Sequence, residues 1–119
     1  MIPWGPATRV YLAPGATDLR QGFEGLGDRV RHHMKEDPLS GHLFAFSNRN
    51  HTRVKLLYCD GSGTWILAKR LEKGRFHWPR EGEEPGPAAL QILAEELTLL
   101  LSGSDLEKTR SRAWWRKTV

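Results

Sequence analysis

Apolar positions recur with two different periods in the first third of the chain, and each period predicts one kind of element. Arg9–Ala13 is short, apolar-rich and followed by Pro14-Gly15, which predicts a strand that ends in a turn. From residue 17 to residue 37 the apolar positions lie three or four residues apart, as they do on the buried side of a helix. These positions are Leu19, Phe23, Leu26, Val30 and Met34.

The start and the interior of this predicted helix carry further signals. Thr17 or Asp18 can cap its first turn, and Asp18 with Gln21 loosely resembles a capping box. An interior glycine costs about 1 kcal/mol of helix stability relative to alanine. The helix contains three, namely Gly22, Gly25 and Gly27. We therefore expect close backbone packing of this helix, on the protein's own sheet or, as the alternative, on a partner.

Short apolar runs separated by turn residues fill the middle of the chain and predict four more strands. These strands are residues 41–46, 53–59, 64–70 and 75–79. Asp60-Gly61-Ser62-Gly63 suits a hairpin turn between two of them, and Pro79 suits the edge of a sheet. The order of runs and turns therefore predicts an antiparallel meander.

The last third of the chain predicts a linker, a helix and a tail. Residues 80–87 are rich in glycine, proline and glutamate, whereas Ala88–Ser102 carries leucines at helical spacing and is followed by Gly103. We expect a single α+β domain over residues 1–103, built as an antiparallel β-meander of four to five strands with two packed helices. Residues 104–119 are expected to form a flexible, basic, tryptophan-containing tail.

The composition is that of an ordinary soluble globular protein, with 27% charged and 39% hydrophobic residues. Cys59 is the only cysteine, so no internal disulfide can form and a cysteine-ligated zinc site is not expected. The N-terminal residues show no secretory signal pattern, and the apolar-rich stretch 88–101 is too short and too polar to span a bilayer. We therefore expect a cytoplasmic protein that does not associate with membranes.

Charge is segregated along the chain, and this matters more than the net charge of +4. Residues 1–40 carry equal numbers of basic and acidic side chains. Residues 41–80 carry eight basic and two acidic side chains, and residues 108–119 carry five basic and no acidic ones. The intervening residues 81–107 carry seven acidic side chains and no lysine or arginine. Two basic blocks thus flank an acidic one.

The basic residues of these blocks are candidates for DNA contacts, because lysine and arginine neutralise phosphates. The predicted DNA-binding residues are Arg49, Arg53, Lys55, Lys69, Arg70, Lys73, Arg75, Arg110 and Arg112. Hairpin geometry brings Arg53 and Lys55 to the same end as Lys69 and Arg70, far from the turn at Gly61. The alternative is that these are solvated strand-end charges that suppress edge pairing.

Aromatic residues are interleaved with this basic block and could stack on bases. We expect them to belong to the core instead. They are Phe44, Phe46, Trp65 and Phe76. In the tail, Trp114-Trp115 lies among basic residues. These tryptophans have two alternative roles, stacking on or inserting between DNA bases and packing on the protein core.

Catalysis has little support in the sequence. The five histidines lack the spacing of a metal-binding motif, and no glycine-rich loop has the pattern that cradles phosphates. Asp18 and Asp60 have simpler interpretations as a helix cap and a turn residue. We therefore expect a protein that is not an enzyme and that uses no cofactor and no metal.

Several stretches are distinctive together: residues 17–26, 41–46, 55–61 and 68–79. They resemble the small accessory protein of the IS66-type insertion sequences, the product of the second reading frame, often called TnpB. RNA-guided nucleases of other insertion sequences share that name but are several times longer. The resemblance covers about residues 1–80 and the leucine-rich helix. It implies a role in transposition beside a separate transposase and a second accessory protein, without catalysis, and it supplies no site residues.

Two functions are consistent with these observations. The first is a non-catalytic accessory protein for transposition of a bacterial insertion sequence that binds DNA through a basic patch. The second is a protein–protein interaction module that scaffolds the transposase complex, or self-associates, without touching DNA. The acidic segment 81–107 and the helix with Gly22 and Gly25 would be its surfaces.

Overall fold

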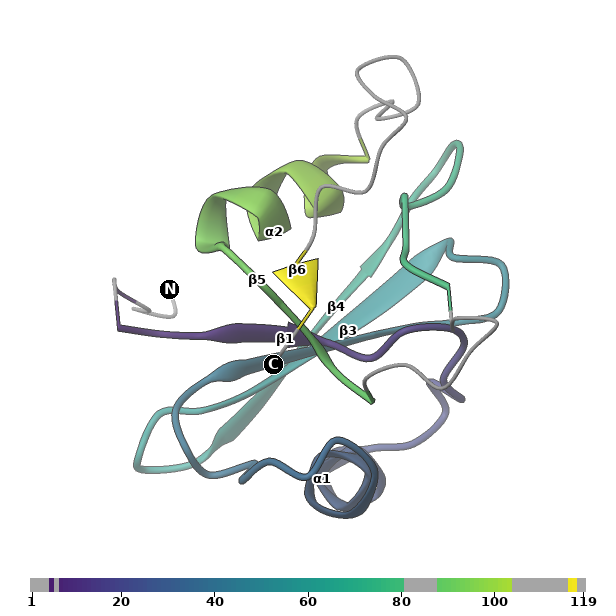
Figure 1. Cartoon of the computed structure of the whole chain (residues 1–119). Coiled ribbons are helices and arrows are strands. Elements are labelled where there is room, and N and C mark those ends of the chain that lie inside the picture. Colours follow the sequence, from purple (N-terminus) through teal and green to yellow (C-terminus); the bar gives the residue numbers. More distant parts are fainter. Residues whose placement is uncertain (1–4, 6, 81–87, 104–115, 118–119) are drawn as a thin grey trace.

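A computed structural model describes residues 5, 7–80, 88–103 and 116–117 of the chain (Figure 1). The elements in chain order are β1 (Val10–Leu12), α1 (Phe23–Asp28), the π-helical η1 (Arg29–His33), β2 (Leu43–Ser47), β3 (Arg53–Cys59), β4 (Thr64–Arg70), β5 (Leu90–Ile92), α2 (Ala94–Ser102) and β6 (Arg116–Lys117).

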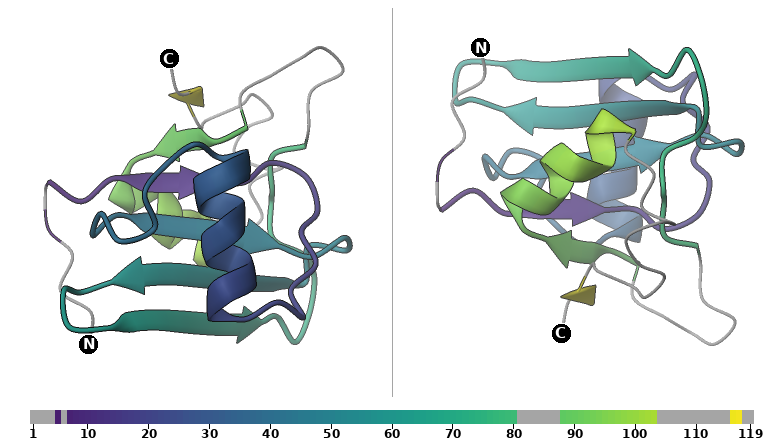
Figure 2. Two further views of the ribbon diagram at one scale, coloured as in Figure 1. Left: turned by 90° about the horizontal axis from the view of Figure 1, so that it is seen from below. Right: turned by 90° about the horizontal axis from the view of Figure 1, so that it is seen from above.

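The strands form one six-stranded sheet in the order β4-β3-β2-β1-β5-β6. β1 and β2 are parallel, whereas every other neighbouring pair is antiparallel. The parallel pair follows from the chain path, because α1 and η1 cross the sheet between β1 and β2 (Figure 2). The predicted α+β class is confirmed, and most strands are antiparallel as expected, but the sheet is mixed.

The two helices cover opposite faces of the sheet, so the molecule has three layers (Figure 1). On the α1 side, Leu26 and Val30 are completely buried and pack in one cluster with Phe44, Phe46 and Leu57. These sheet residues alternate along β2 and β3 with residues that face the other way, which is the period of two expected of a strand.

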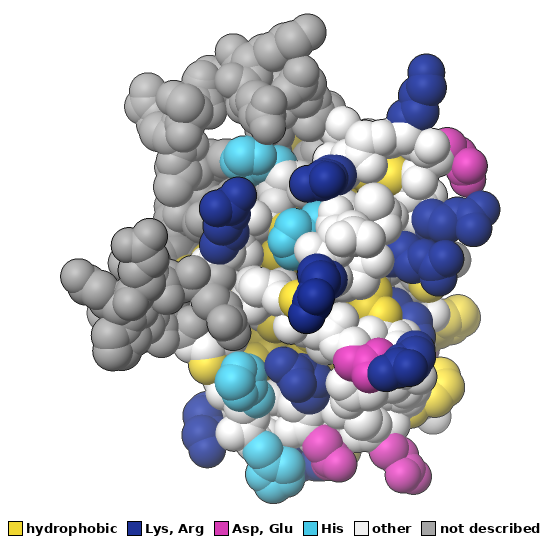
Figure 3. Space-filling view, turned by 90° about the vertical axis from the view of Figure 1, so that its right-hand side faces the viewer, with side chains coloured by type: hydrophobic (Ala, Val, Ile, Leu, Met, Phe, Trp, Pro, Cys, Tyr) yellow, Lys and Arg dark blue, Asp and Glu magenta, His cyan; other side chains and the backbone are white. Residues whose placement is uncertain are grey.

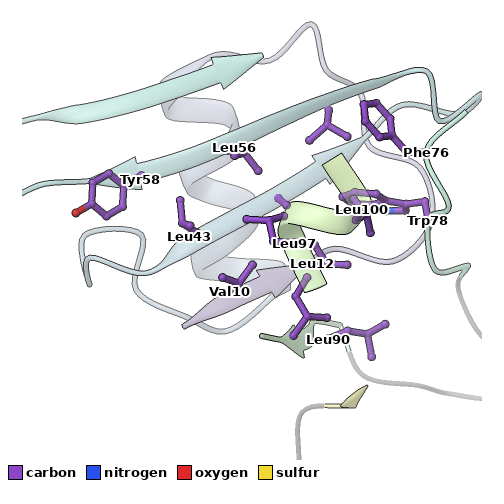
Figure 4. Packing of buried hydrophobic residues seen from close by; sticks show 13 residues of the cluster. Val10, Leu12, Leu43, Leu56, Tyr58, Phe76, Trp78, Leu90, Leu97 and Leu100 are labelled. Carbon is purple, nitrogen blue, oxygen red and sulfur yellow. The ribbon is translucent and has the colours of Figure 1, made fainter. Parts of the chain in front are cut away.

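On the α2 side, Leu97 and Leu100 point from the helix toward the sheet (Figure 4). Phe76 and Trp78, from the segment after β4, complete this cluster. The indole Nε1 of Trp78 donates a hydrogen bond to the backbone oxygen of Ala13 over 2.9 Å. The segment after β4 is thereby fixed to the end of β1.

The first helix begins later than the sequence predicts. α1 starts at Phe23, Gly22 occupies the N-cap position, and no side chain caps the helix. Asp18 instead binds Arg20, accepting hydrogen bonds from the backbone and the guanidinium of that residue. The capping prediction is therefore wrong, because a local ion pair takes up the carboxylate. Leu19 still packs against the α1-side core.

The glycines of this region do not serve close packing on the sheet. A β-carbon at Gly22 or Gly27 would meet no atom within 4 Å. At Gly25 its nearest neighbours would be side-chain atoms of Gln21, the closest at 2.7 Å. Since the sheet does not approach these positions, the prediction of backbone packing on it is wrong.

Two further predicted elements differ from the structure. The predicted helix 88–102 is divided into β5, which pairs with β1, and the shorter α2. Residues 75–79 form no strand, although the backbone N–H of Phe76 donates to the oxygen of His51 over 2.7 Å. Phe76 and Trp78 are buried on either side of the half-buried His77, so the alternation reflects core packing of an irregular segment.

The C-terminal residues that the structure describes are Arg116–Lys117, whose backbone forms β6 against β5. The rest of the predicted tail, including Arg110 and Arg112, lies outside the described residues, so its flexibility stays a prediction. Among the described helices, none has the length and apolar character needed to cross a membrane.

Candidate nucleic-acid interface

The loop between β2 and β3 is held by the side chain of Asn48. Its Oδ1 accepts hydrogen bonds from the backbone N–H groups of Thr52 (2.9 Å) and Arg53 (3.1 Å). His51 lies in the left-handed region with φ 58°, which closes the turn. This network fixes the backbone that carries Arg49 and Arg53.

An open groove of about 1270 Å³ lies beside this loop, lined by residues from the three segments 16–20, 48–55 and 68–72. The backbone N–H of Thr17 donates to the oxygen of Ser47 over 2.7 Å, which holds the first segment against the end of β2. Figure 3 looks onto this end of the molecule and shows many lysine and arginine side chains with few acidic ones. The fold thus gathers basic residues that are far apart in the sequence.

Two of the predicted DNA-binding lysines tie the helical layers to the sheet. Lys55 is half-buried, and its Nζ donates to the backbone oxygen of Gln21, just before α1, over 3.2 Å. Lys69 lies opposite Val54, on the α2 side, and its Nζ donates to the oxygen of Leu101 over 2.8 Å. The predicted patch is therefore divided between the two faces of the sheet.

Three of the predicted arginines, Arg49, Arg53 and Arg70, line the groove together. Arg53 and Arg70 are directly opposite each other on β3 and β4, on the α1 side. Arg49 lines the same groove, and the side chains of Arg49 and Arg53 have no hydrogen-bond or ion-pair partner among the described residues. Arg70 has only a loose, exposed ion pair with Glu72 at 3.5 Å. Like charges opposite each other on neighbouring strands are destabilising.

Arg75 and Arg80 add positive charge around His51. The His51 ring stacks on Trp78, with ring centres 6.4 Å apart, and its Nδ1 lies 3.2 Å from the hydroxyl of Ser47. Partial burial, followed by the charges of Arg75 and Arg80, lowers the pKa of His51, so this ring is neutral at neutral pH. Arg80 is not among the predicted site residues, because only the folded chain brings its charge close enough to act on His51.

We call the following five residues the basic end: Arg49, Arg53, Arg70, Arg75 and Arg80. Lys73 is exposed in the turn after β4. Arg20, which the sequence reasoning did not select either, also lines the groove, but it is paired with Asp18 at 2.9 Å. The hydrogen bonds from Arg20 lower the pKa of Asp18 to about 2, so this pair is ionised at neutral pH.

The aromatic residues of the basic block are mostly core residues. Phe44, Phe46 and Phe76 are buried as expected. Trp65 is the exception, because half of its surface is exposed on β4. Its assignment to the core is wrong, since α2 does not cover this edge of the sheet (Figure 2).

A second surface feature lies at the other end of β4. A hollow of about 370 Å³ is lined by residues of α1 and η1, by Thr64 and by the segment before β2. Phe23 and Leu39, at its rim, expose 56% and 63% of their surface. Asp28 and Arg31 also line it and form an exposed ion pair at 3.2 Å. This hollow thus has exposed apolar side chains beside an ion pair, whereas the basic end carries mainly positive charge.

Metal-ligating residues do not converge in the part of the chain that the structure describes. No group of three or more histidine, cysteine, aspartate or glutamate side chains there could hold a metal ion.

Comparisons with known proteins identify one family and two similar proteins. A family model described as IS66 Orf2 like protein matches residues 8–111. The uncharacterized protein y4hO of Sinorhizobium fredii (strain NBRC 101917 / NGR234) is 41% identical over 118 residues, which cover 99% of this chain and 97% of that protein. The uncharacterized protein y4jC of the same strain is 32% identical, with the same coverage. No solved structure matches.

Proposed function

We propose that this chain, which belongs to the IS66 Orf2-like family, is a non-catalytic accessory protein of insertion-sequence transposition that binds DNA through its basic end. Family membership supports the accessory role in transposition. The DNA contact rests on the groove and its arginines. The transposase and a second accessory protein of the same element are the protein partners that we propose.

The observation that carries the DNA contact is the pair formed by Arg53 and Arg70. These residues face each other directly across β3 and β4, which is unfavourable in the free protein. A phosphate between them would replace this repulsion with two charge-assisted hydrogen-bonded contacts, and the planar guanidinium suits phosphate geometry. Arg49 has no partner among the described residues that would compete with a phosphate for its guanidinium.

This arrangement recognises the DNA backbone rather than base edges. Arginine–phosphate contacts fix where the protein sits on a duplex and give an affinity that falls with salt. Each phosphate neutralised contributes about −0.9 to the slope of log affinity against log salt on duplex DNA. The basic end should therefore give a steep salt dependence with little preference for sequence.

The test compares duplex binding by the wild-type chain and by a variant with Arg49→Gln, Arg53→Gln and Arg75→Gln, across a salt series. Fluorescence anisotropy with a labelled duplex of random sequence, and with the terminal sequence of the encoding element, gives the slopes. The variant should bind more weakly and lose about 3 from its salt slope. These side chains have no described partners, so the fold should be retained.

Arg31→Gln is the matched control. It makes the same kind of substitution, removing one positive charge rather than three, at an exposed side chain of the hollow beyond the other end of β4. Its salt slope should equal that of the wild type. Equal slopes for the triple variant and the wild type, or no binding to either duplex, would overturn the proposed DNA contact.

The alternative function, a scaffold that holds the transposase without contacting DNA, has its own supporting observation. The exposed apolar side chains of Phe23 and Leu39 line one hollow on the α1 side. Of the acidic segment proposed for this role, residues 81–87 and 104–107 lie outside the described residues. A complex with the transposase that survives nuclease treatment, and that Phe23→Ser disrupts, would favour this alternative over the DNA contact.

A further inference from the structure

β4 is the outermost strand on its side of the sheet, and its outer edge is open in the part of the chain that the structure describes (Figure 2). It pairs with β3 through all seven residues without a bulge. It contains no proline. An edge strand of this length offers a row of unpaired backbone N–H and C=O groups, and natural proteins usually blunt such edges.

The side chains in the middle of β4 are apolar and partly uncovered. Trp65 and Leu67 expose 50% and 37% of their surface, and they lie on the α2 side, opposite Tyr58 and Leu56. On the other side, Ile66 is partly buried against the α1-side core. The edge therefore combines open backbone groups with exposed apolar surface, a combination found where another strand is added.

Charge is distributed unequally along this edge. Lys69 and Arg70 make the last two positions of β4 basic. Near its start, the indole Nε1 of Trp65 donates to Oδ2 of Asp60 over 2.8 Å, which places a carboxylate beside the tryptophan. β4 thus has a carboxylate at its start and two basic residues at its end. A strand with the same charge distribution would complement it if the two strands ran antiparallel.

We propose that the outer edge of β4 pairs with the β4 edge of a second copy of this chain, in an antiparallel, two-fold symmetric arrangement. Full overlap of the two seven-residue strands places Leu67 opposite its own counterpart. It places Trp65 opposite Lys69 of the second copy, a pair without like charges. It also places Thr64 opposite Arg70 of the second copy, so no like charges face each other.

A second copy fits this edge because two identical strands that run antiparallel place the basic end of each beside the acidic end of the other. A parallel arrangement in register would set the two Lys69-Arg70 ends side by side, and like charges on neighbouring strands are unfavourable. The interface of one strand pair is small compared with stable dimers, and each copy carries a net charge of +4. We therefore expect a reversible dimer whose population rises with protein and salt concentration.

The test is the mass of the full chain in solution over a range of protein concentrations, measured by sedimentation velocity. The wild type should shift from monomer to dimer. Leu67→Lys and Leu67→Glu should each weaken self-association at least about tenfold, because like charges then face each other at the two-fold axis. A mixture of the two variants should dimerise again, since a lysine then faces a glutamate.

Leu99→Lys is the control, because it places the same charge on a leucine that is half exposed on α2. It should dimerise as the wild type does, and unfolding curves check that all variants are folded. A wild type that is monomeric at every concentration overturns the proposal. So do dimers that persist in both Leu67 variants, or a mixture that fails to restore them.

Discussion

At the scale of single residues, the number of basic side chains overstated what is available for binding. The charge of Lys55 and Lys69 predicts DNA contacts. Lys55 instead donates to a backbone oxygen just before α1, and Lys69 donates to one in the last turn of α2. Hairpin geometry in the sequence does predict that Arg53 and Lys55 lie at the same end as Lys69 and Arg70, and the register of β3 and β4 agrees. The hydrogen bonds could not be predicted, because Gln21 and Leu101 come from elements distant in the sequence.

Asp60 gives a pH-dependent prediction at this scale. The hydrogen bond from the Trp65 indole, followed by those from Ser62 and Gly63, lowers its pKa from 3.8 to about 2. A carboxyl group with a lowered pKa stabilises the fold above its unfolded pKa and loses that contribution as the pH falls through the folded value. The Nε1–H resonance of Trp65 should therefore titrate with a midpoint at about pH 2.

Two variants check the assignment of that titration. Asp60→Asn should abolish it and should flatten the loss of stability between the two pKa values. Asp18→Asn removes another carboxyl group with a pKa of about 2, but at the groove, and should leave the Trp65 resonance unchanged. A midpoint at 3.8, the ordinary value, would show that the hydrogen bond to the indole is not formed in solution.

At the scale of elements, local sequence signals predict strand bounds correctly, whereas they do not predict which distant strands pair. β3 and β4 have the predicted bounds, because alternation and the Asp60–Gly63 turn specify them locally. The sequence predicts helix for β5, since the spacing of Leu90, Leu93, Leu97 and Leu100 is helical. Its pairing with β1 depends on a strand near the other end of the chain. The parallel β1–β2 pair was missed for the same reason.

The side chain of Glu96 stabilises the start of α2. Oε1 of Glu96 accepts a hydrogen bond from the backbone N–H of Leu93 over 2.8 Å, at the junction of β5 and α2. Glu96→Ala leaves that N–H group without its partner, and loss of such a cap costs about 1 kcal/mol. The free energy of unfolding from urea denaturation should fall by this amount.

Glu95→Ala is the comparison for that measurement. Glu95 is exposed, lies in the same first turn and carries the same charge, so its removal tests the interaction with the helix dipole alone. It should lower stability less than Glu96→Ala does. An equal loss in the two variants would mean that the Leu93 hydrogen bond contributes nothing.

At the scale of the whole molecule, the fold converts charge segregated along the sequence into charge concentrated in space. The basic block predicted a charged surface, but only the arrangement of the 16–20, 48–55 and 68–72 segments creates the groove. The sequence could not show that the charge of Arg80 acts on His51, or that Arg49 lines one groove with Arg53 and Arg70. The basic end lies at one end of the sheet, and the hollow lined by Phe23 and Leu39 lies at the other.

The central claim is that the basic end is the surface that meets DNA. Its most direct test is the set of backbone amide resonances that shift when the isotope-labelled chain is titrated with a short duplex. The shifts should concentrate in residues 16–20, 48–55 and 68–80, and they should diminish as salt is raised. Shifts centred on Phe23 and Leu39, or no shifts at saturating duplex, would contradict it.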